Sequence, residues 1–191
     1  ILIDLGNLQE AEKYFRKAID LNPNFAKAHS NLGTILIDLG NLQEAQKYFR
    51  KAIDLNPYFA EAYFNLANLE LLQGDYKRGL ENYEFRFKKE KPSPVHGYPK
   101  IKKIFNNEFQ PKEKLLVITE QGLGDTLQYM RYIPYLRNQG LKISFCAQEK
   151  LHSLIKSSGI DQNPLTPKDA SEVSEGKWIP LLSLLRYLQV N

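Results

Sequence analysis

The fold of this chain is decided by a stretch that occurs twice: ILIDLGNLQEAEKYFRKAID at residues 1–20 and ILIDLGNLQEAQKYFRKAID at residues 35–54. The agreement extends beyond these stretches, because residues 1–34 and 35–68 are identical at 27 of 34 positions. A period of 34 residues is typical of helical-hairpin repeats, in which each unit folds as two antiparallel helices. The sequence therefore predicts a helical solenoid for the first half of the chain.

Each unit contains two amphipathic stretches, and in the second copy they run from Phe25 to Leu39 and from Asn41 to Leu55. Gly40 between them suits the left-handed position at a helix end, and Asn41 can cap the next helix. Apolar residues of the second stretch recur at spacings of three and four, which defines one buried stripe. These residues are Leu42, Ala45, Phe49, Ala52 and Ile53.

The residues resemble the tetratricopeptide repeat family. The positions that match its motif are Leu32, Gly33, Ala45, Phe49, Ala52, Pro57, Leu66 and Ala67. A third unit, residues 69–91, keeps Gly74 and Tyr83 but diverges elsewhere, as expected for a last repeat. The resemblance implies a right-handed superhelix over residues 1–91, with a concave groove lined by the first helix of each unit.

This groove is the binding site that the resemblance implies for a protein or peptide. The side chains expected to face it are Lys27, Asn31, Glu61, Phe64, Asn65 and Asn68. The repeats are similar to those of the protein O-linked N-acetylglucosamine transferases, in which an asparagine at the place of Asn31 and Asn65 clamps a peptide backbone. An amide can both donate to and accept from a peptide unit. The alternative is that both asparagines only bond neighbouring helices.

Composition excludes several classes of protein. With 42% hydrophobic and 25% charged residues, the chain is typical of a soluble globular protein and is neither disordered nor collagen-like. One cysteine excludes a disulfide framework and a multi-thiolate zinc site, and the three scattered histidines lack metal-ligand spacing. We therefore expect no metal and no other cofactor. No apolar run approaches the ~20 residues needed to span a bilayer, so we expect a cytoplasmic protein without a membrane partner.

A segment rich in lysine and proline, residues 88–114, interrupts the helical pattern. The formal charge of +4 arises after the repeats: residues 1–91 carry 13 basic and 13 acidic side chains, and residues 92–191 carry 13 and 9. Glutamates interleave with the lysines, which favours a solvated linker over a nucleic-acid site. We assign residues 92–113 to this linker and do not expect nucleic acid as a partner.

Residues 114–191 are predicted to form an α/β domain. Strands and helices alternate in them, which is typical of a doubly wound parallel sheet. The predicted order is a strand at 115–118, a helix at 126–139, a strand at 141–147, a helix at 150–157, a short third strand within 159–165 and a last helix near 180–188. Pro134 lies inside the first of these helices and predicts a kink or a break.

The turn between the first strand and helix of this domain, EQGLGDT at residues 120–126, is the candidate for chemistry. Ligands of such sheets bind where the strands end. Gly122 and Gly124 allow an anion to approach backbone amides, and with Gln121 and Thr126 they form the predicted anion-facing or acceptor-facing loop. The spacing matches neither a dinucleotide fingerprint nor a P-loop, so it assigns no reaction.

The stretch LLVITEQGLGDTLQYMRYIPYLRNQGLKISFCAQEKLHSLI, residues 115–155, resembles the opening of a glycosyltransferase lobe that follows tetratricopeptide repeats in bacterial proteins and is related to the heptosyltransferases. The resemblance implies the Rossmann-like first lobe of a GT-B fold, which holds the acceptor while a second lobe binds the nucleotide sugar. In heptosyltransferases the aspartate after the glycine of this turn is the proposed general base, and Asp125 matches it. The alternative is that Asp125 only caps the helix, in a capping box with Gln128.

The chain begins at Ile1 and is short for a two-lobed enzyme, which needs two domains of roughly 150 residues. We therefore expect an interior segment of a longer protein, with the donor-binding lobe outside it. The predicted function is a peptide-binding repeat module attached to a partial acceptor lobe. We expect this chain to be inactive alone and to belong to a glycosyltransferase that takes its sugar from a nucleotide sugar bound by the second lobe, with transfer of the O-linked N-acetylglucosamine type as one candidate reaction. The alternative is a non-catalytic scaffold or adaptor.

Overall fold

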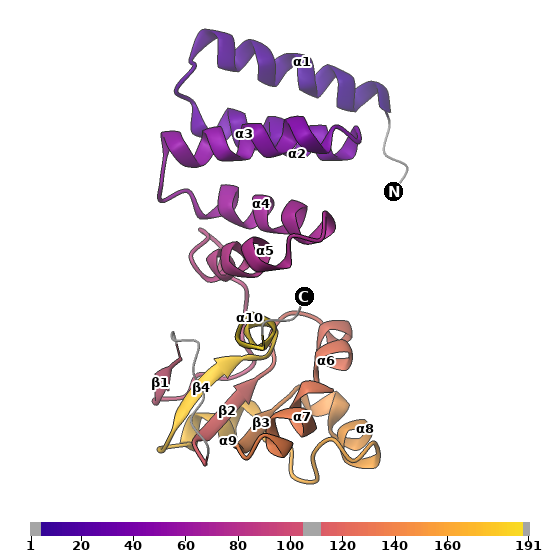
Figure 1. Ribbon diagram of the computed structural model, residues 1–191, viewed down its shortest axis with the longest axis vertical. Coiled ribbons are helices and arrows are strands. Elements are labelled where there is room, and N and C mark those ends of the chain that lie inside the picture. Colours follow the sequence, from indigo (N-terminus) through magenta and orange to yellow (C-terminus); the bar gives the residue numbers. More distant parts are fainter. Residues whose placement is uncertain (1–4, 105–111, 189–191) are drawn as a thin grey trace. The chain divides into compact units, whose positions relative to one another are not determined.

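The computed structural model describes residues 5–104 and 112–188 and divides the chain into two compact units, which meet in sequence between Pro92 and Ser93 (Figure 1). Each unit has its own hydrophobic core. The first unit is entirely helical in its described part, and the second is built on a parallel sheet.

The first unit repeats its helices with the period of its sequence. Its elements are α1 (Leu5–Leu21), α2 (Ala26–Asp38), α3 (Leu42–Leu55), α4 (Ala60–Leu72), α5 (Tyr76–Tyr83) and the 3-10 turn η1 (Glu84–Phe87). Both α2 and α4 begin at an alanine 34 residues apart, and α2 packs on α3 as α4 packs on α5. The predicted solenoid of helical hairpins is confirmed.

The turn between α2 and α3 explains the glycine of the repeat. Gly40 has a φ of 81°, the left-handed conformation that glycine adopts without strain. The N–H of Asn41 donates to the carbonyl of Leu36 at 2.7 Å, which ties the chain back onto α2. The side chain of Asn41 does not cap α3, so that prediction is wrong. At the equivalent position the carboxylate of Asp75 does cap α5, as expected for a charged and therefore stronger acceptor.

The core of the first unit is packed around Phe49, which is fully buried. Its ring lies directly on the backbone of α2: a Cβ added at Gly33 would stand 2.6 Å from Phe49 Cε1. Ala45 and Ala52, on either side of Phe49 in α3, are also fully buried. The small residues of the repeat motif are therefore the ones that allow α2 and α3 to approach closely.

The second unit contains a four-stranded parallel sheet in the order β1-β4-β2-β3. The strands are β1 (Lys102–Lys103), β2 (Lys114–Ile118), β3 (Lys142–Cys146) and β4 (Lys177–Pro180). The helices are α6 (Leu123–Tyr129), α7 (Tyr132–Asn138), α8 (His152–Ser157), α9 (Pro167–Glu172) and α10 (Leu184–Tyr187), with 3-10 turns η2 (Glu149–Leu151) and η3 (Leu181–Ser183).

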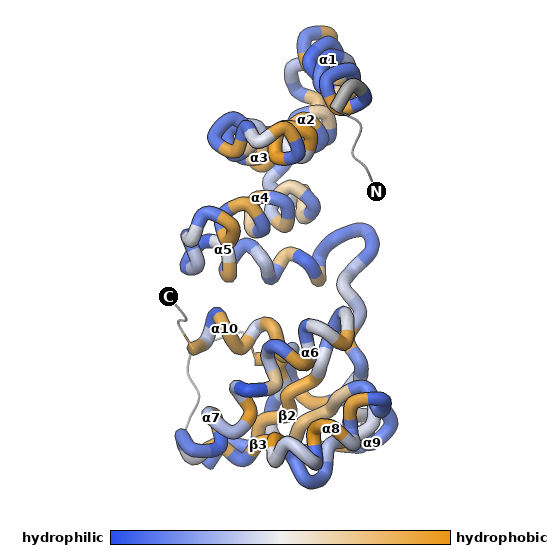
Figure 2. Tube along the Cα trace, turned by 90° about the vertical axis from the view of Figure 1, so that its right-hand side faces the viewer, coloured by the Kyte–Doolittle hydropathy of each residue, from blue (hydrophilic) through white to orange (hydrophobic). Residues whose placement is uncertain are grey.

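The two faces of this sheet are covered differently. The tube through β2 is strongly hydrophobic (Figure 2), and its side chains alternate between two cores. Leu115 and Val117 pack in a core with residues of α7, α8 and α10. Leu116 and Ile118 pack in a core with Ala170 of α9 and with residues of the extended segment before β1. A helical layer therefore covers one face, and a short helix with extended chain covers the other.

Part of the segment predicted as a linker belongs to this second unit. Val95 pairs with Glu120 in an antiparallel bridge, and residues 102–103 form the edge strand β1. Proline-rich chain is suited to this position, because residues without an N–H fit at the surface of a sheet and not within a helix. The remaining stretch, 105–111, lies outside the described residues.

Two further departures concern local structure. The helix predicted at 126–139 is two helices, α6 and α7, which are separated at Met130 and Arg131; Pro134 lies in the first turn of α7, where its missing N–H costs no helical bond. The predicted break is confirmed. Within 159–165 only Leu165 pairs with the sheet, through a bridge to Cys146, so the third strand of the predicted order lies instead at β4.

Candidate functional site

The α2–α4 face, defined as the six predicted groove residues on α2 and α4, is partly open. Lys27 and Asn68 are exposed and Asn31 is half-buried. The amide Nδ2 of Asn65 lies 3.5 Å from Ser30 Oγ and 3.4 Å from Thr34 Oγ1, so this side chain joins α4 to α2. Asn65 therefore forms the bonds to a neighbouring helix that were the alternative to peptide binding in the sequence analysis.

The other two residues of the α2–α4 face contact the chain's own segment after η1. Oε1 of Glu61 accepts a hydrogen bond from the backbone N–H of Glu90 at 2.9 Å. The ammonium of Lys89 lies 4.1 Å from the centre of the Phe64 ring, a cation–π contact. The ends of this face therefore differ: α2 leaves its polar side chains open, whereas the start of α4 is already engaged within the unit.

The turn after β2 is organised around a helix that begins earlier than predicted. Gly122 is the N-cap of α6, and Asp125 is its third residue, where Oδ2 accepts from the Gly122 N–H at 3.0 Å. The predicted capping box of Asp125 with Gln128 is therefore wrong, because α6 starts at Leu123. Asp125 does stabilise the helix start, but from inside the first turn.

The remaining residues of the predicted loop divide into exposed and buried ones. Gly122 and Gly124 are exposed, whereas Thr126 is fully buried and its Oγ1 donates to Gln148 Oε1 at 2.8 Å. Gln121 has a φ of 59° and donates its N–H to the carbonyl of Pro94 at 3.3 Å. The structure thus brings Gln121, Gly122 and Asp125 together at the carboxyl end of β2, while Thr126 points into the unit.

Glu120 is a residue that the sequence did not single out. It is fully buried, and its Oε1 accepts from the Leu182 N–H at 3.0 Å. This bond joins the loop after β2 to the turn after β4, the two strands between which the chain order of the sheet reverses. Ligands of open α/β sheets bind at such a point. A carboxylate two residues after a buried strand was the available signal.

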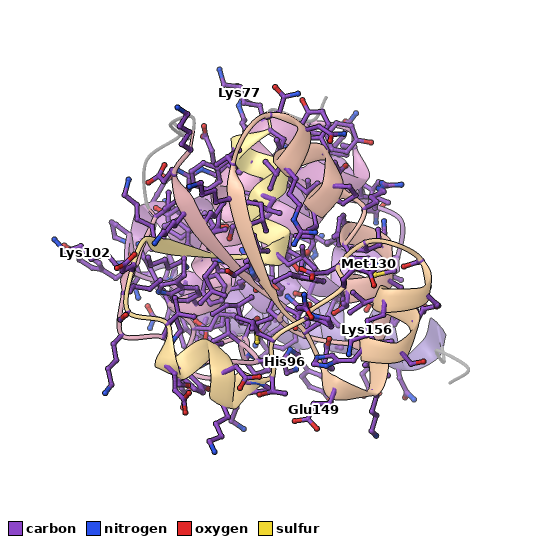
Figure 3. The ribbon with its side chains drawn as sticks, turned by 90° about the horizontal axis from the view of Figure 1, so that it is seen from below. Lys77, His96, Lys102, Met130, Glu149 and Lys156 are labelled. Carbon is purple, nitrogen blue, oxygen red and sulfur yellow. The ribbon has the colours of Figure 1, made fainter. Side chains whose placement is uncertain are left out.

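Chemistry by thiol or metal is not suggested by the described residues. Burial raises the pKa of Cys146 to about 12, with a smaller contribution from Asp169, so the thiol is a poor nucleophile. His96, labelled in Figure 3, lies 3.2 Å through Nδ1 from Thr119 Oγ1. Across residues 5–104 and 112–188 no group of His, Cys, Asp and Glu could hold a metal ion. Within the same ranges no helix combines the length and the apolar character that a membrane span requires.

Comparison with known families locates the repeats. Three sequence families described as tetratricopeptide or TPR repeats match residues 1–40, 26–59 and 48–81. Curated protein sequences give no significant match. The first unit therefore consists of tetratricopeptide repeats over residues 1–81.

Solved structures that resemble the chain include the TPR2B-domain:pHsp70 complex of yeast Sti1, with 28% identity, a TM-score of 0.41 and coverage of 44% of this chain and 67% of that one. YrrB, described as a TPR protein with an unusual peptide-binding site, is 28% identical, with a TM-score of 0.36 and 37% of each chain covered. MamA is 20% identical, with a TM-score of 0.40 and coverage of 46% and 55%. The chain thus spans about a third to two thirds of the length of these proteins.

Proposed function

Because residues 1–81 are tetratricopeptide repeats, we propose that the first unit binds an extended protein segment along the α2–α4 face. The observation that carries this proposal is the regular placement of polar side chains on two helices that share one register. Asn31 and Asn65 occupy the same place 34 residues apart, and exposed Lys27 and Asn68 flank them. The opposite sides of α2 and α4 are buried in the core.

Asn31 and Asn68 are the side chains best placed to hold a peptide backbone. An amide offers a donor and an acceptor at the spacing of a peptide unit, so it binds extended chain with little regard to sequence. Asn65 has a different part, since its bonds to Ser30 and Thr34 fix the distance between α2 and α4. The proposal therefore expects backbone recognition by Asn31 and Asn68, with Asn65 as a positioning residue.

An array of short unstructured peptides, probed with the labelled chain, tests this proposal. Asn31→Ala and Asn68→Ala should each weaken binding several-fold across peptides of different sequence, because the lost bonds are to backbone. Lys47→Ala is the control, since Lys47 is exposed on α3 and lies outside this face. Unchanged binding by both asparagine variants, at unchanged thermal stability, would overturn the proposal.

A second candidate function concerns the second unit: we propose that it is the acceptor-binding lobe of a glycosyltransferase whose donor is a nucleotide sugar. The support is the position of Asp125 at the carboxyl end of a parallel strand, half-buried and held by the Gly122 N–H. A carboxylate fixed in this way can accept a proton from a hydroxyl brought within hydrogen-bond reach. The 191-residue chain alone is expected to show no transfer.

Asp125→Asn separates the catalytic role from the structural one. The asparagine oxygen can still accept the bond from Gly122, so the start of α6 should persist while the basic group is lost. In a protein that includes the donor lobe, the transfer rate should fall by about 10²-fold or more with little change in melting temperature. A preserved rate would remove Asp125 as the base and leave the scaffold function.

A further inference from the structure

We propose a second docking site on the first unit, separate from the α2–α4 face: a pocket among α3, α4 and α5 that takes an acidic side chain of a partner protein between Arg50 and Arg78. The pocket has a volume of about 470 Å³, and both arginines line it. At the equivalent place one repeat earlier, the protein closes the same gap with its own side chains.

At the earlier place Arg16 of α1 is neutralised within the unit. Its Nη2 lies 2.7 Å from Glu12 Oε1 and 2.9 Å from Glu44 Oε1, and its Nη1 donates to the Tyr48 hydroxyl at 2.9 Å. Glu44 and Tyr48 belong to α3, so this contact, called here the Arg16 clamp, joins two successive second helices of the repeat.

The repeat keeps the arginine and replaces all of its partners. Thirty-four residues after Arg16 stands Arg50, but Glu12 becomes Gln46, Glu44 becomes Arg78 and Tyr48 becomes Asn82. A guanidinium therefore stands where the accepting carboxylate of the clamp was. Among the described residues Arg50 has no ion pair, and Arg78 has a single distant one, 3.7 Å to Asp75.

Two acids, Glu70 and Asp54, also line the pocket, and among the described residues neither forms an ion pair with Arg50 or Arg78. Glu70 replaces Leu36 of the previous repeat, is 2% exposed and accepts from Asn82 Nδ2 at 2.8 Å through Oε2. Burial raises the pKa of Glu70. Asp54 is exposed on α3 and forms no ion pair among the described residues.

The ligand chemistry follows from the guanidinium groups and from the pocket wall. A carboxylate can accept paired N–H groups from a guanidinium fork, and one placed between Arg50 and Arg78 would supply the acceptor that Glu44 supplies to Arg16. Ile53, Leu66 and the Tyr63 ring also line the pocket and offer contact to methylene groups. A glutamate side chain can both pair with the guanidinium groups and pack its methylene groups on the pocket wall, whereas a bare inorganic anion can only pair with the guanidinium groups.

Side-chain NMR of the arginine Nε–Hε groups tests the site directly. The probes are N-acetyl-glutamate methylamide, its glutamine analogue and inorganic phosphate, at equal concentration and ionic strength. The glutamate probe should shift the Arg50 and Arg78 resonances several-fold more than the glutamine probe, with Arg16 unaffected. Equal responses to the glutamate and glutamine probes, or a phosphate response as large as that to glutamate, would overturn the acidic side chain as the ligand.

A rebuilt clamp provides the matched test by mutation. Arg78→Glu with Asn82→Tyr restores two of the three partners of the Arg16 clamp around Arg50, the equivalents of Glu44 and Tyr48, so the Arg50 response to the glutamate probe should be lost while the protein stays folded. Lys77→Glu is the control: it makes the same change in charge one residue away, and Lys77 points outward from the molecule (Figure 3). Loss of the response in the control, or its persistence in the rebuilt clamp, would refute the site.

Discussion

The contact between α1 and α3 is closed by charged side chains, whereas the equivalent contact between α3 and α5 leaves a pocket. In the first, Arg16 lies within 3 Å of Glu12 and Glu44. In the second, Arg50 and Arg78 both line a pocket of about 470 Å³. The buried positions of the repeat maintain the helical hairpin, but the polar side chains between hairpins decide whether the surface is closed or open to a partner.

The largest loss of stability is expected from a substitution in the core around α3, the helix that takes part in both the α1–α3 and the α3–α5 contact. Phe49→Ala removes a fully buried ring between α2 and α3 and should lower the free energy of unfolding by about 3–5 kcal/mol. Phe15→Ala, the same change one repeat earlier, should cost clearly less because Phe15 is only half-buried. Urea unfolding followed by circular dichroism measures both. Equal losses would show that α1 is packed as tightly as α3.

A smaller substitution, at Gly33, tests how closely α2 and α3 approach each other. Gly33→Ala places a methyl group where Phe49 Cε1 would be 2.6 Å away, so the ring must move. We expect a loss of about 1–3 kcal/mol in the same unfolding experiment. Combining Gly33→Ala with Phe49→Leu should recover part of this loss. A neutral Gly33→Ala would mean that the two helices separate without cost.

The charged clamp is expected to contribute less, since its side chains are partly exposed. Arg16→Ala should destabilise the unit by about 0.5–1 kcal/mol, and this loss should shrink at high salt. Arg50→Ala should change stability by less than about 0.5 kcal/mol, because Arg50 forms no ion pair with any residue that the structure describes. If Arg50→Ala were the more costly of the two, Arg50 would take part in stabilising interactions at least as strong as those of Arg16.

Substitution of Glu70 is expected to change stability least, and its effect should depend most on pH. Burial raises the pKa of its carboxyl in the folded state, and nearby Asp75 adds to this, so folding favours the protonated form. The stability that the protonated Glu70 carboxyl contributes is fully present below the pKa of the unfolded state and is lost as the pH rises through the pKa of the folded state. Glu70→Gln keeps an acceptor for Asn82 and should therefore raise the melting temperature by a few degrees at neutral pH, with a gain that vanishes near pH 4. A pH-independent gain would exclude this cause.

The helices of the first unit were predictable because their signals lie within one repeat. The spacing of Ala45, Phe49 and Ala52 marks a buried stripe, and Gly40 marks the turn, whatever surrounds them. The strand around Val117 was predictable for a similar reason, since its short apolar run is buried on both faces of the sheet. In the candidate site, Asp125 was recognised as a residue of the turn, but its place in the helix was not.

What the sequence missed depends on partners far along the chain. Glu120 accepts a hydrogen bond from the N–H of Leu182, and Glu61 accepts one from the N–H of Glu90. Because the partners are far apart in the sequence, neither bond leaves a local pattern. Leu165 was expected in a strand, but only pairing with the sheet could show that β4 takes that place. The pairing of Arg50 and Arg78 in one pocket could not be predicted either, because it depends on how α3 and α5 are placed around that pocket.

The sequence by itself determined the 34-residue solenoid and the parallel strand-helix order, because burial periodicity and turn residues act over a few positions. The tertiary structure alone decided which strand lies between β1 and β2, how proline-rich chain covers the second face of the sheet, and that Arg50 and Arg78 line one pocket. These outcomes follow from hydrogen bonds and charges between distant segments. Their energies depend on geometry that no local pattern encodes.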